Sequence, residues 1–118
     1  MAVKDVVGAY GERLVARTLS DQGWVILDRN WRCELGEIDI VALDADALVV
    51  VEVKTRRSAA FGGAMEAVTA RKVMRLRRLA ARWLAEHGGR FGSVRIDVAA
   101  VTLPRAGSAH IEHLRSVT

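Results

Sequence analysis

Three ionisable side chains stand in two stretches of sequence that otherwise have the composition of buried strands. The first stretch is Gly36-Glu37-Ile38-Asp39-Ile40-Val41 and the second is Val49-Val50-Val51-Glu52-Val53-Lys54. Burying a carboxylate or an ammonium group without a partner is costly, so these charges need a structural or a functional reason. Two carboxylates followed by a lysine can hold a divalent metal ion and a water molecule beside it, which is an arrangement suited to phosphodiester hydrolysis.

The spacing of these charges allows them to meet. Residues two apart in a strand share a face, so Glu52 and Lys54 point the same way while Val51 and Val53 point the other way. If a hairpin joins the two stretches, Asp39 can lie beside Glu52. Oxygen ligands of this kind suit Mg²⁺ or Mn²⁺. Lys54 could orient the attacking water or neutralise the charge that develops on the phosphorus.

A purely structural explanation also accounts for these residues. Asp39, Glu52 and Lys54 could lie on the solvated face of an antiparallel hairpin and form cross-strand ion pairs. In an arbitrary protein this explanation is the commoner one. The residues alone leave both explanations open here, because the elements that follow should cover at least part of both sheet faces.

Hydrophobic periodicity predicts the elements that would position these side chains. Helices are expected at Lys4–Gln22 and Met65–His87, and strands at Trp24–Trp31, Leu35–Leu43, Leu48–Lys54, Val94–Leu103 and His110–Val117. Short connections make the first three strands an antiparallel meander. The long helix then forms a crossover that places the fourth strand parallel to the third. The predicted fold is α/β, a mixed central sheet flanked by helices.

Length and composition set broad limits. At 118 residues the chain is expected to form one domain, residues 1–118, that buries about 65% of its unfolded surface. No apolar stretch approaches the ~20 residues that a membrane span needs, and the N-terminus lacks a signal-peptide core. We therefore expect a soluble, cytoplasmic protein without a membrane partner. The single cysteine, Cys33, cannot form an internal disulfide and is expected to be a passive thiol.

Basic residues indicate a polyanionic partner. The net charge is +4, and Arg71, Arg75, Arg78 and Arg82 follow helical spacing and form one stripe. The stripe is either a solvated face or a surface that contacts nucleic-acid phosphates. The apolar positions opposite the stripe should face the sheet; they are Val73, Leu76, Ala80, Trp83 and Leu84.

Two further arginines are better candidates for substrate contact. Arg56 and Arg57 directly follow the second charged strand, in a segment that continues to Phe61 and Gly62-Gly63 and could close over nucleic acid. The chain has no recognisable base-reading element, so binding without base-specific readout is expected. The three tryptophans, Trp24, Trp31 and Trp83, are expected in the core and not as base-stacking platforms.

The pattern of residues resembles the YraN-like family of uncharacterised bacterial proteins from about Gly8 to Val101. The matching residues are Gly8, Gly11-Glu12, Ala16, Leu19, Gly23, Asn30, Arg32, Gly36-Glu37-Ile38-Asp39, Val51-Glu52-Val53-Lys54-Thr55-Arg56, Phe61-Gly62, Glu66-Ala67-Val68, Lys72 and Arg95-Ile96-Asp97-Val98. That family is similar to the restriction-endonuclease-like superfamily and, within it, to archaeal Holliday-junction resolvases. The superfamily signature is an acidic residue, a spacer, and then Asp or Glu, any residue, and Lys. Asp39, Glu52 and Lys54 match it, although the proline that often precedes the first acid is replaced by Ile38.

The resemblance implies a restriction-endonuclease-like fold and a Mg²⁺-dependent or Mn²⁺-dependent nuclease that acts on branched or damaged DNA, or alternatively on RNA. It adds Glu12 to Asp39 and Glu52 as a third metal ligand and implies a homodimer. Glu37 would have a supporting role, or would pair with Lys54 or an arginine. The alternative is a non-catalytic nucleic-acid-binding or protein-interaction module that retains the nuclease fold.

Overall fold

A computed structural model describes residues 5–57 and 68–117 of the chain. In chain order the elements are α1 (Val6–Asp21), β1 (Val25–Cys33), β2 (Gly36–Asp44), β3 (Ala47–Arg56), α2 (Ala70–His87), β4 (Ser93–Thr102) and β5 (His110–Leu114). Within these ranges, the two helices and five strands have the types and the order that the sequence predicts.

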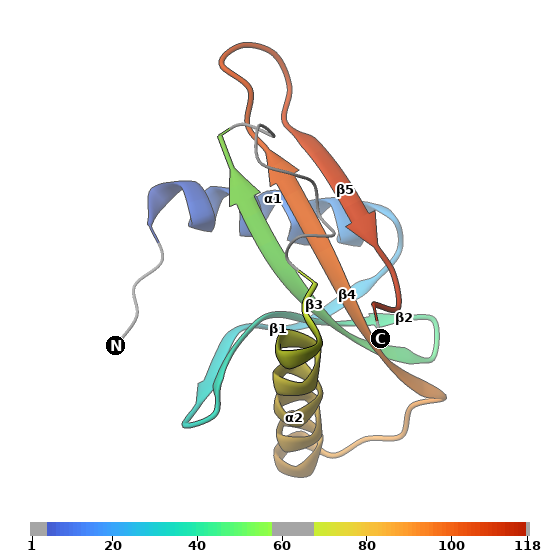
Figure 1. Ribbon diagram of the computed structural model, residues 1–118. Coiled ribbons are helices and arrows are strands. Elements are labelled where there is room, and N and C mark those ends of the chain that lie inside the picture. Colours follow the sequence, from blue (N-terminus) through green and yellow to red (C-terminus); the bar gives the residue numbers. More distant parts are fainter. Residues whose placement is uncertain (1–4, 58–67, 118) are drawn as a thin grey trace.

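The strands form one mixed sheet in the order β1-β2-β3-β4-β5 (Figure 1). β1, β2 and β3 are antiparallel neighbours, and Asp44 pairs with Ala47 across a two-residue turn. β3 and β4 are parallel, as a crossover through α2 requires, and β5 returns antiparallel to β4 at the edge of the sheet. This confirms the predicted α/β architecture.

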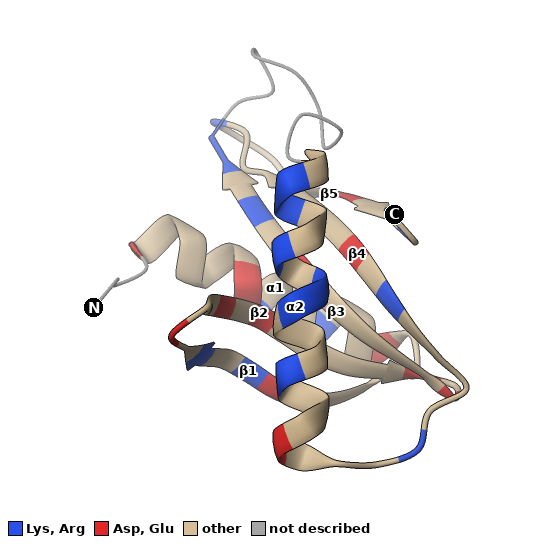
Figure 2. Ribbon diagram, turned by 60° about the horizontal axis from the view of Figure 1, so that its bottom comes forward, with Lys and Arg blue, Asp and Glu red and all other residues tan. Residues whose placement is uncertain are grey.

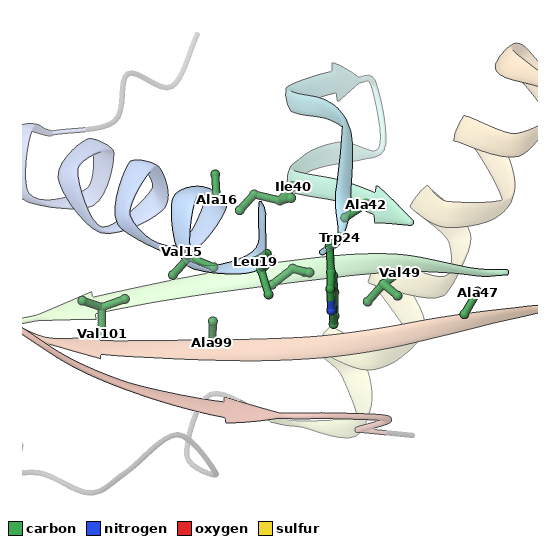
Figure 3. Close-up of a cluster of buried hydrophobic side chains, with 11 residues drawn as sticks. Val15, Ala16, Leu19, Trp24, Ile40, Ala42, Ala47, Val49, Ala99 and Val101 are labelled. Carbon is green, nitrogen blue, oxygen red and sulfur yellow. The ribbon is translucent and has the colours of Figure 1, made fainter. Parts of the chain in front are cut away.

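One helix covers part of each face of the sheet. Val49 and Val51 belong to a buried cluster with α1 residues such as Val15 and Leu19 (Figure 3). Leu48 and Val50, the alternate residues of β3, belong to a second cluster with α2 residues that include Leu76, Leu79, Ala80 and Trp83. Because successive strand residues point to opposite faces, α1 and α2 lie on opposite sides of β3.

The predicted core positions are largely confirmed. Leu76, Ala80 and Trp83 are buried on α2, whereas Val73 and Leu84 are only half-buried. Leu79 is also completely buried, although it is not among the predicted core positions. Trp24 and Trp83 are buried, and Trp31 is half-buried against the α2 cluster.

The predicted start of the long helix at Met65 is wrong. Thr69 has extended backbone angles, and its side chain accepts a hydrogen bond from the Lys72 N–H at 3.1 Å, so α2 begins at Ala70. Hydrophobic periodicity does not detect such a cap. The Thr69 hydroxyl satisfies one of the backbone N–H groups that have no hydrogen-bond acceptor within the helix. Residues 65–67 lie outside the described part of the chain, as do Phe61 and Gly62-Gly63.

The ends of the other elements agree with the prediction within three residues. The first helix is capped at its start by Asp5, whose side chain accepts a hydrogen bond from the Gly8 N–H. The last strand ends at Leu114 and not at Val117, because Ser116 has φ 54° and the Val117 N–H bonds to Ile96 O. In the described residues no helix is both long and apolar enough to cross a membrane.

Candidate active site

The candidate site lies where β2 separates from β3. Their ladder runs from Asp44 and Ala47 to Ile40 and Val51 and pairs no residues beyond that point. The Asp39 side chain replaces the next rung, because its Oδ2 accepts a 2.8 Å hydrogen bond from the Val53 N–H. Figure 1 shows the two strands diverging, with β1 and β2 crossing the view and β3 and β4 rising steeply.

A bend in β2 at Asp39 explains this separation. Ile38 and Ile40 should share a face, yet Ile38 packs in the α2 cluster and Ile40 in the α1 cluster. Asn30, which lies opposite Asp39 on β1, has a positive φ of 54°, a conformation that asparagine tolerates better than most residues. The distortion therefore affects both strands at the position of the carboxylate.

The structure brings Asp39 and Glu52 together. The Asp39 residue is 6% exposed and the Glu52 side chain is 17% exposed. Burial, followed by the neighbouring Asp39 charge, raises the pKa of Glu52 to about 7. Two carboxylates crowded into a partly closed site favour either a proton or a cation between them.

Lys72 of α2 contacts Glu52, whereas the predicted Lys54 is placed on β3. Lys54 lies two residues beyond Glu52 on β3, and its side chain is exposed. From the first turn of α2, Lys72 Nζ lies 3.9 Å from Glu52 Oε1. The charges of Lys72 and Arg75 both oppose the upward shift in the pKa of Glu52. Lys72 is not among the predicted site residues, although it is one of the residues that resemble the YraN-like family.

Glu12 is buried on α1, with 1% of the residue exposed. Its Oε1 lies 3.6 Å from Arg29 Nη2 of β1. The helix α1 approaches β3 closely just before Glu12. At the preceding Gly11, an added Cβ would collide with the side chain of Thr55 on β3. Only glycine fits at that contact without displacing the helix.

Glu37 pairs with an arginine, which is one of the two partners that the sequence analysis considered. Its Oε2 accepts a 2.6 Å hydrogen bond from Arg32 Nε, and the two residues are directly paired between β1 and β2. This cross-strand ion pair is partly exposed.

The donors present fit a magnesium or manganese ion held by few protein ligands. Among residues 5–57 and 68–117, no three His, Cys, Asp or Glu side chains form a group that could hold a metal ion. Glu12 is thus not part of such a group with Asp39 and Glu52 in this structure. Magnesium commonly binds one or two carboxylates and completes its octahedron with water and substrate phosphate, so the Asp39–Glu52 pair is a sufficient start.

The arginine stripe of α2 divides into two parts. Arg71, Arg75 and Arg78 are exposed and line a surface pocket of about 560 Å³ with Leu35 and Met74. Arg82 is instead engaged, with Nη2 2.7 Å from Glu34 Oε1 and Nε 2.8 Å from Glu86 Oε2. In Figure 2, α2 passes in front of β2 and β3, and blue Lys and Arg positions are visible along the helix.

Arg56 and Arg57 lie at the C-terminal end of β3. Arg56 is the last residue of β3 and pairs with Thr102 of β4, and Arg57 is exposed directly after it. They therefore lie on the element that carries Glu52 and Lys54, beyond Lys54 along the strand.

A second buried carboxylate, Asp97, lies on the α1 side of the sheet. It accepts hydrogen bonds from His113 Nε2, from the Arg95 guanidinium and from the Ser116 N–H. Arg95 also lies over the ring of Trp24. Burial would raise the pKa of Asp97, but the hydrogen bonds from His113 and Arg95 outweigh burial and lower it. Asp97 thus anchors the C-terminal segment to β4.

Comparisons with known proteins agree with the pattern found in the sequence. Residues 11–101 match the profile of a group described as uncharacterised protein family UPF0102. A UPF0102 protein of Beutenbergia cavernae is 59% identical over 117 residues, covering 99% of both chains. A UPF0102 protein of Kineococcus radiotolerans is 56% identical over 116 residues, covering 98% of this chain and 95% of its own.

Proposed function

This chain belongs to the uncharacterised protein family UPF0102, and we propose that it is a metal-dependent nuclease that cleaves phosphodiester bonds in DNA. The observation that carries the proposal is the placement of Asp39 and Glu52 where β2 leaves β3. There burial and the neighbouring charge raise the pKa of Glu52 to about 7. A protein that needed these residues only for stability would gain nothing from two carboxylates held so close.

In the proposed mechanism Asp39 and Glu52 would hold Mg²⁺ or Mn²⁺. Asp39 has an Oδ2 that is already oriented by the Val53 N–H, so it is preorganised as a ligand. When bound, the ion would lower the pKa of a water molecule and stabilise negative charge on the phosphate. Lys54, on the face that it shares with Glu52, would orient that water. Catalysis would then rest on Asp39, Glu52 and Lys54.

Glu12 and Glu37 have less direct roles in this proposal. The family resemblance implies that Glu12 is a third metal ligand, and Glu12 is buried on α1 beside Arg29 of β1. In the structure described here Glu12 contacts Arg29 and forms no metal-binding group with Asp39 and Glu52. Glu37 would hold Arg32 through their 2.6 Å hydrogen bond and so stiffen the hairpin that carries Asp39.

The substrate would be gripped by its phosphates. Arg71, Arg75 and Arg78 line one open pocket beside the site, and Arg56 and Arg57 follow the catalytic strand. Such contacts carry no sequence information, so binding should depend on shape and on salt concentration. We propose branched or damaged DNA as the substrate and a homodimer as the acting form, because resolvase-like nucleases cut paired strands.

The test is cleavage of a panel of junction, flap, duplex, single-stranded DNA and RNA substrates with Mg²⁺ or Mn²⁺. Wild type should cut at least one of them, and Glu52→Gln and Lys54→Met should each lose at least ~100-fold in rate. Glu112→Gln is the matched control, because Glu112 is an exposed carboxylate on β5. Cleavage that survives Glu52→Gln would remove the pair from the mechanism.

A non-catalytic nucleic-acid-binding module is the second candidate. It is favoured by the pocket of exposed arginines on α2, which could bind phosphates without help from the carboxylates. For this candidate, DNA affinity should fall when Arg71, Arg75 and Arg78 are substituted. It should not change when metal is removed or Asp39 is substituted. Binding measured with EDTA and with Mg²⁺ on the same DNA separates the two functions.

A further inference from the structure

The first turn of α2 delivers a cation to the carboxylate pair. Lys72 Nζ lies 3.9 Å from Glu52 Oε1, and the two side chains are 25% and 17% exposed. The backbone of Lys72 is fixed, because its N–H donates to the side chain of the capping residue Thr69. The cap therefore places Lys72 where its ammonium group reaches the Glu52 carboxylate.

The contact between Lys72 and Glu52 is loose. At 3.9 Å it is an ion pair without a hydrogen bond. The negative charge of Asp39 also repels the ionised Glu52 carboxylate. The pair therefore needs positive charge nearby, yet the geometry does not bind the ammonium group tightly. A cation with stronger preference for carboxylate oxygen could replace it.

We propose that Lys72 is the resident counter-cation of the Asp39–Glu52 pair, and that a divalent metal ion displaces it toward a substrate phosphate. The inference rests on the proposed function, because it concerns the same metal site. It makes Lys72 a positioning residue that couples metal loading to substrate binding. The proposed direction of displacement is toward Arg71, the preceding residue, and Arg75, one helical turn later, which line the open pocket on the same helix.

The first measurement is calorimetric titration of the full chain with Mn²⁺. Lys72→Met removes the charge while keeping an unbranched side chain with good helix propensity. Because the metal no longer has to displace or lie beside an ammonium group, its affinity should rise about 5-fold or more. Arg77→Met is the matched control. Arg77 is on the same helix but lines a different surface pocket, which Leu114 also lines. The Mn²⁺ affinity of this variant should not change.

The second measurement is binding of a labelled DNA junction with EDTA and with Ca²⁺, which occupies oxygen sites. Lys72→Met should weaken junction binding about 3-fold or more with Ca²⁺ and leave it unchanged with EDTA. Lys72→Arg should restore binding in Ca²⁺. Equal weakening in both conditions would make Lys72 a permanent phosphate contact and would overturn the coupling.

These outcomes separate the inference from the proposed function. Tighter Mn²⁺ binding by Lys72→Met, together with a wild type that cuts no substrate, would support the counter-cation and refute the nuclease. Cleavage by wild type, with unchanged or weaker Mn²⁺ binding by Lys72→Met, would refute the counter-cation alone. A wild type that binds no divalent ion would refute both. Thermal melting of each variant confirms that affinity is compared between folded proteins.

Discussion

Asp39 and Val53 are joined across the end of the β2–β3 ladder, where Asp39 Oδ2 accepts a 2.8 Å hydrogen bond from the Val53 N–H. The side chain takes the place of the backbone carbonyl that a continuing strand would supply. The residue proposed to bind metal therefore also satisfies a donor of the strand that carries its partner Glu52. Structural and chemical roles coincide at Asp39, and mutations can separate them.

Asp39→Ala and Asp39→Asn should differ in stability but not in metal binding. Alanine leaves the Val53 N–H without its acceptor and should cost about 1 to 3 kcal/mol of unfolding free energy. Asparagine keeps an oxygen acceptor, so its cost should be smaller. Both should lose Mn²⁺ affinity, because neither has a carboxylate. Urea denaturation and calorimetry check this prediction. Equal destabilisation by both variants would show that the hydrogen bond contributes little.

Glu52→Gln should stabilise the metal-free protein at pH 8. The pKa of Glu52 rises from 4.5 in the unfolded chain to about 7 in the fold, so ionising the carboxyl costs folding free energy. The stability of wild type therefore falls as pH rises from 4.5 to 7, and glutamine avoids this loss. The gain should be about 1 to 3 kcal/mol above pH 7 and absent below pH 4.5.

Urea melts across this pH range, in EDTA, provide the measurement for Glu52. Glu112→Gln on β5 should give a small and nearly constant difference, because Glu112 is exposed. A Glu52→Gln variant that is less stable than wild type at pH 8 would mean that the pairing with Lys72 outweighs the repulsion from Asp39.

Arg78→Ala should weaken DNA binding more than Arg82→Ala. Arg78 is exposed at the pocket, whereas Arg82 is held between Glu34 and Glu86 and its charge is largely compensated. Loss of one phosphate contact should reduce the slope of log affinity against log salt by about 1. Fluorescence anisotropy at several salt concentrations measures the slope. Equal losses for the two variants would favour a generally positive helix over a defined phosphate track.

Local patterns were sufficient to predict the types and order of the elements. The alternation around Glu52 and the helical spacing of Leu76, Ala80 and Trp83 depend only on nearby residues, and both recur in the structure. The hairpin turn between Asp44 and Ala47 likewise set the register that brings Asp39 beside Glu52. The start of α2 was misplaced because its apolar pattern was extended past the Thr69 cap.

Contacts between distant elements could not be predicted in the same way. Arg78 and Arg82 have equivalent helical spacing, and Arg82 differs in pairing with Glu86 on the same helix and with Glu34 of the distant β1–β2 hairpin. Lys72 reaches Glu52 because α2 starts over β3, which spacing does not reveal. Asp97 also stands in a Val-rich and Ile-rich strand, as Asp39 does, yet its hydrogen bonds explain its burial. A charged residue in a buried strand therefore indicates that the charge has a structural or a functional role, but the sequence alone does not distinguish the two.

Asp97→Asn should destabilise the protein most at neutral pH. Because the fold lowers the pKa of Asp97 below its unfolded value of 3.8, the ionised carboxylate contributes stability above that value. This contribution is lost as pH falls through the folded pKa. The cost of the variant should be about 2 to 4 kcal/mol at pH 7 and should shrink below pH 3.8. Urea melts check it, with the exposed Asp21→Asn as control. A pH-independent cost would contradict the ionic role.

Gly11→Ala should destabilise the protein even though alanine is the better helix former. A Cβ at Gly11 would collide with Thr55 Oγ1 and lie 3.0 Å from Thr55 Cβ, so α1 would have to move off β3. Overpacking of this kind costs about 1 to 3 kcal/mol. At Gly8 the nearest atom is Asp5 Oδ1 at 3.1 Å, the acceptor of the Gly8 N–H, so Gly8→Ala needs only a small shift of this cap and should cost less than Gly11→Ala. Adding Thr55→Ala to Gly11→Ala should recover part of the loss in urea melts, and no recovery would mean that the helix is displaced by something other than this contact.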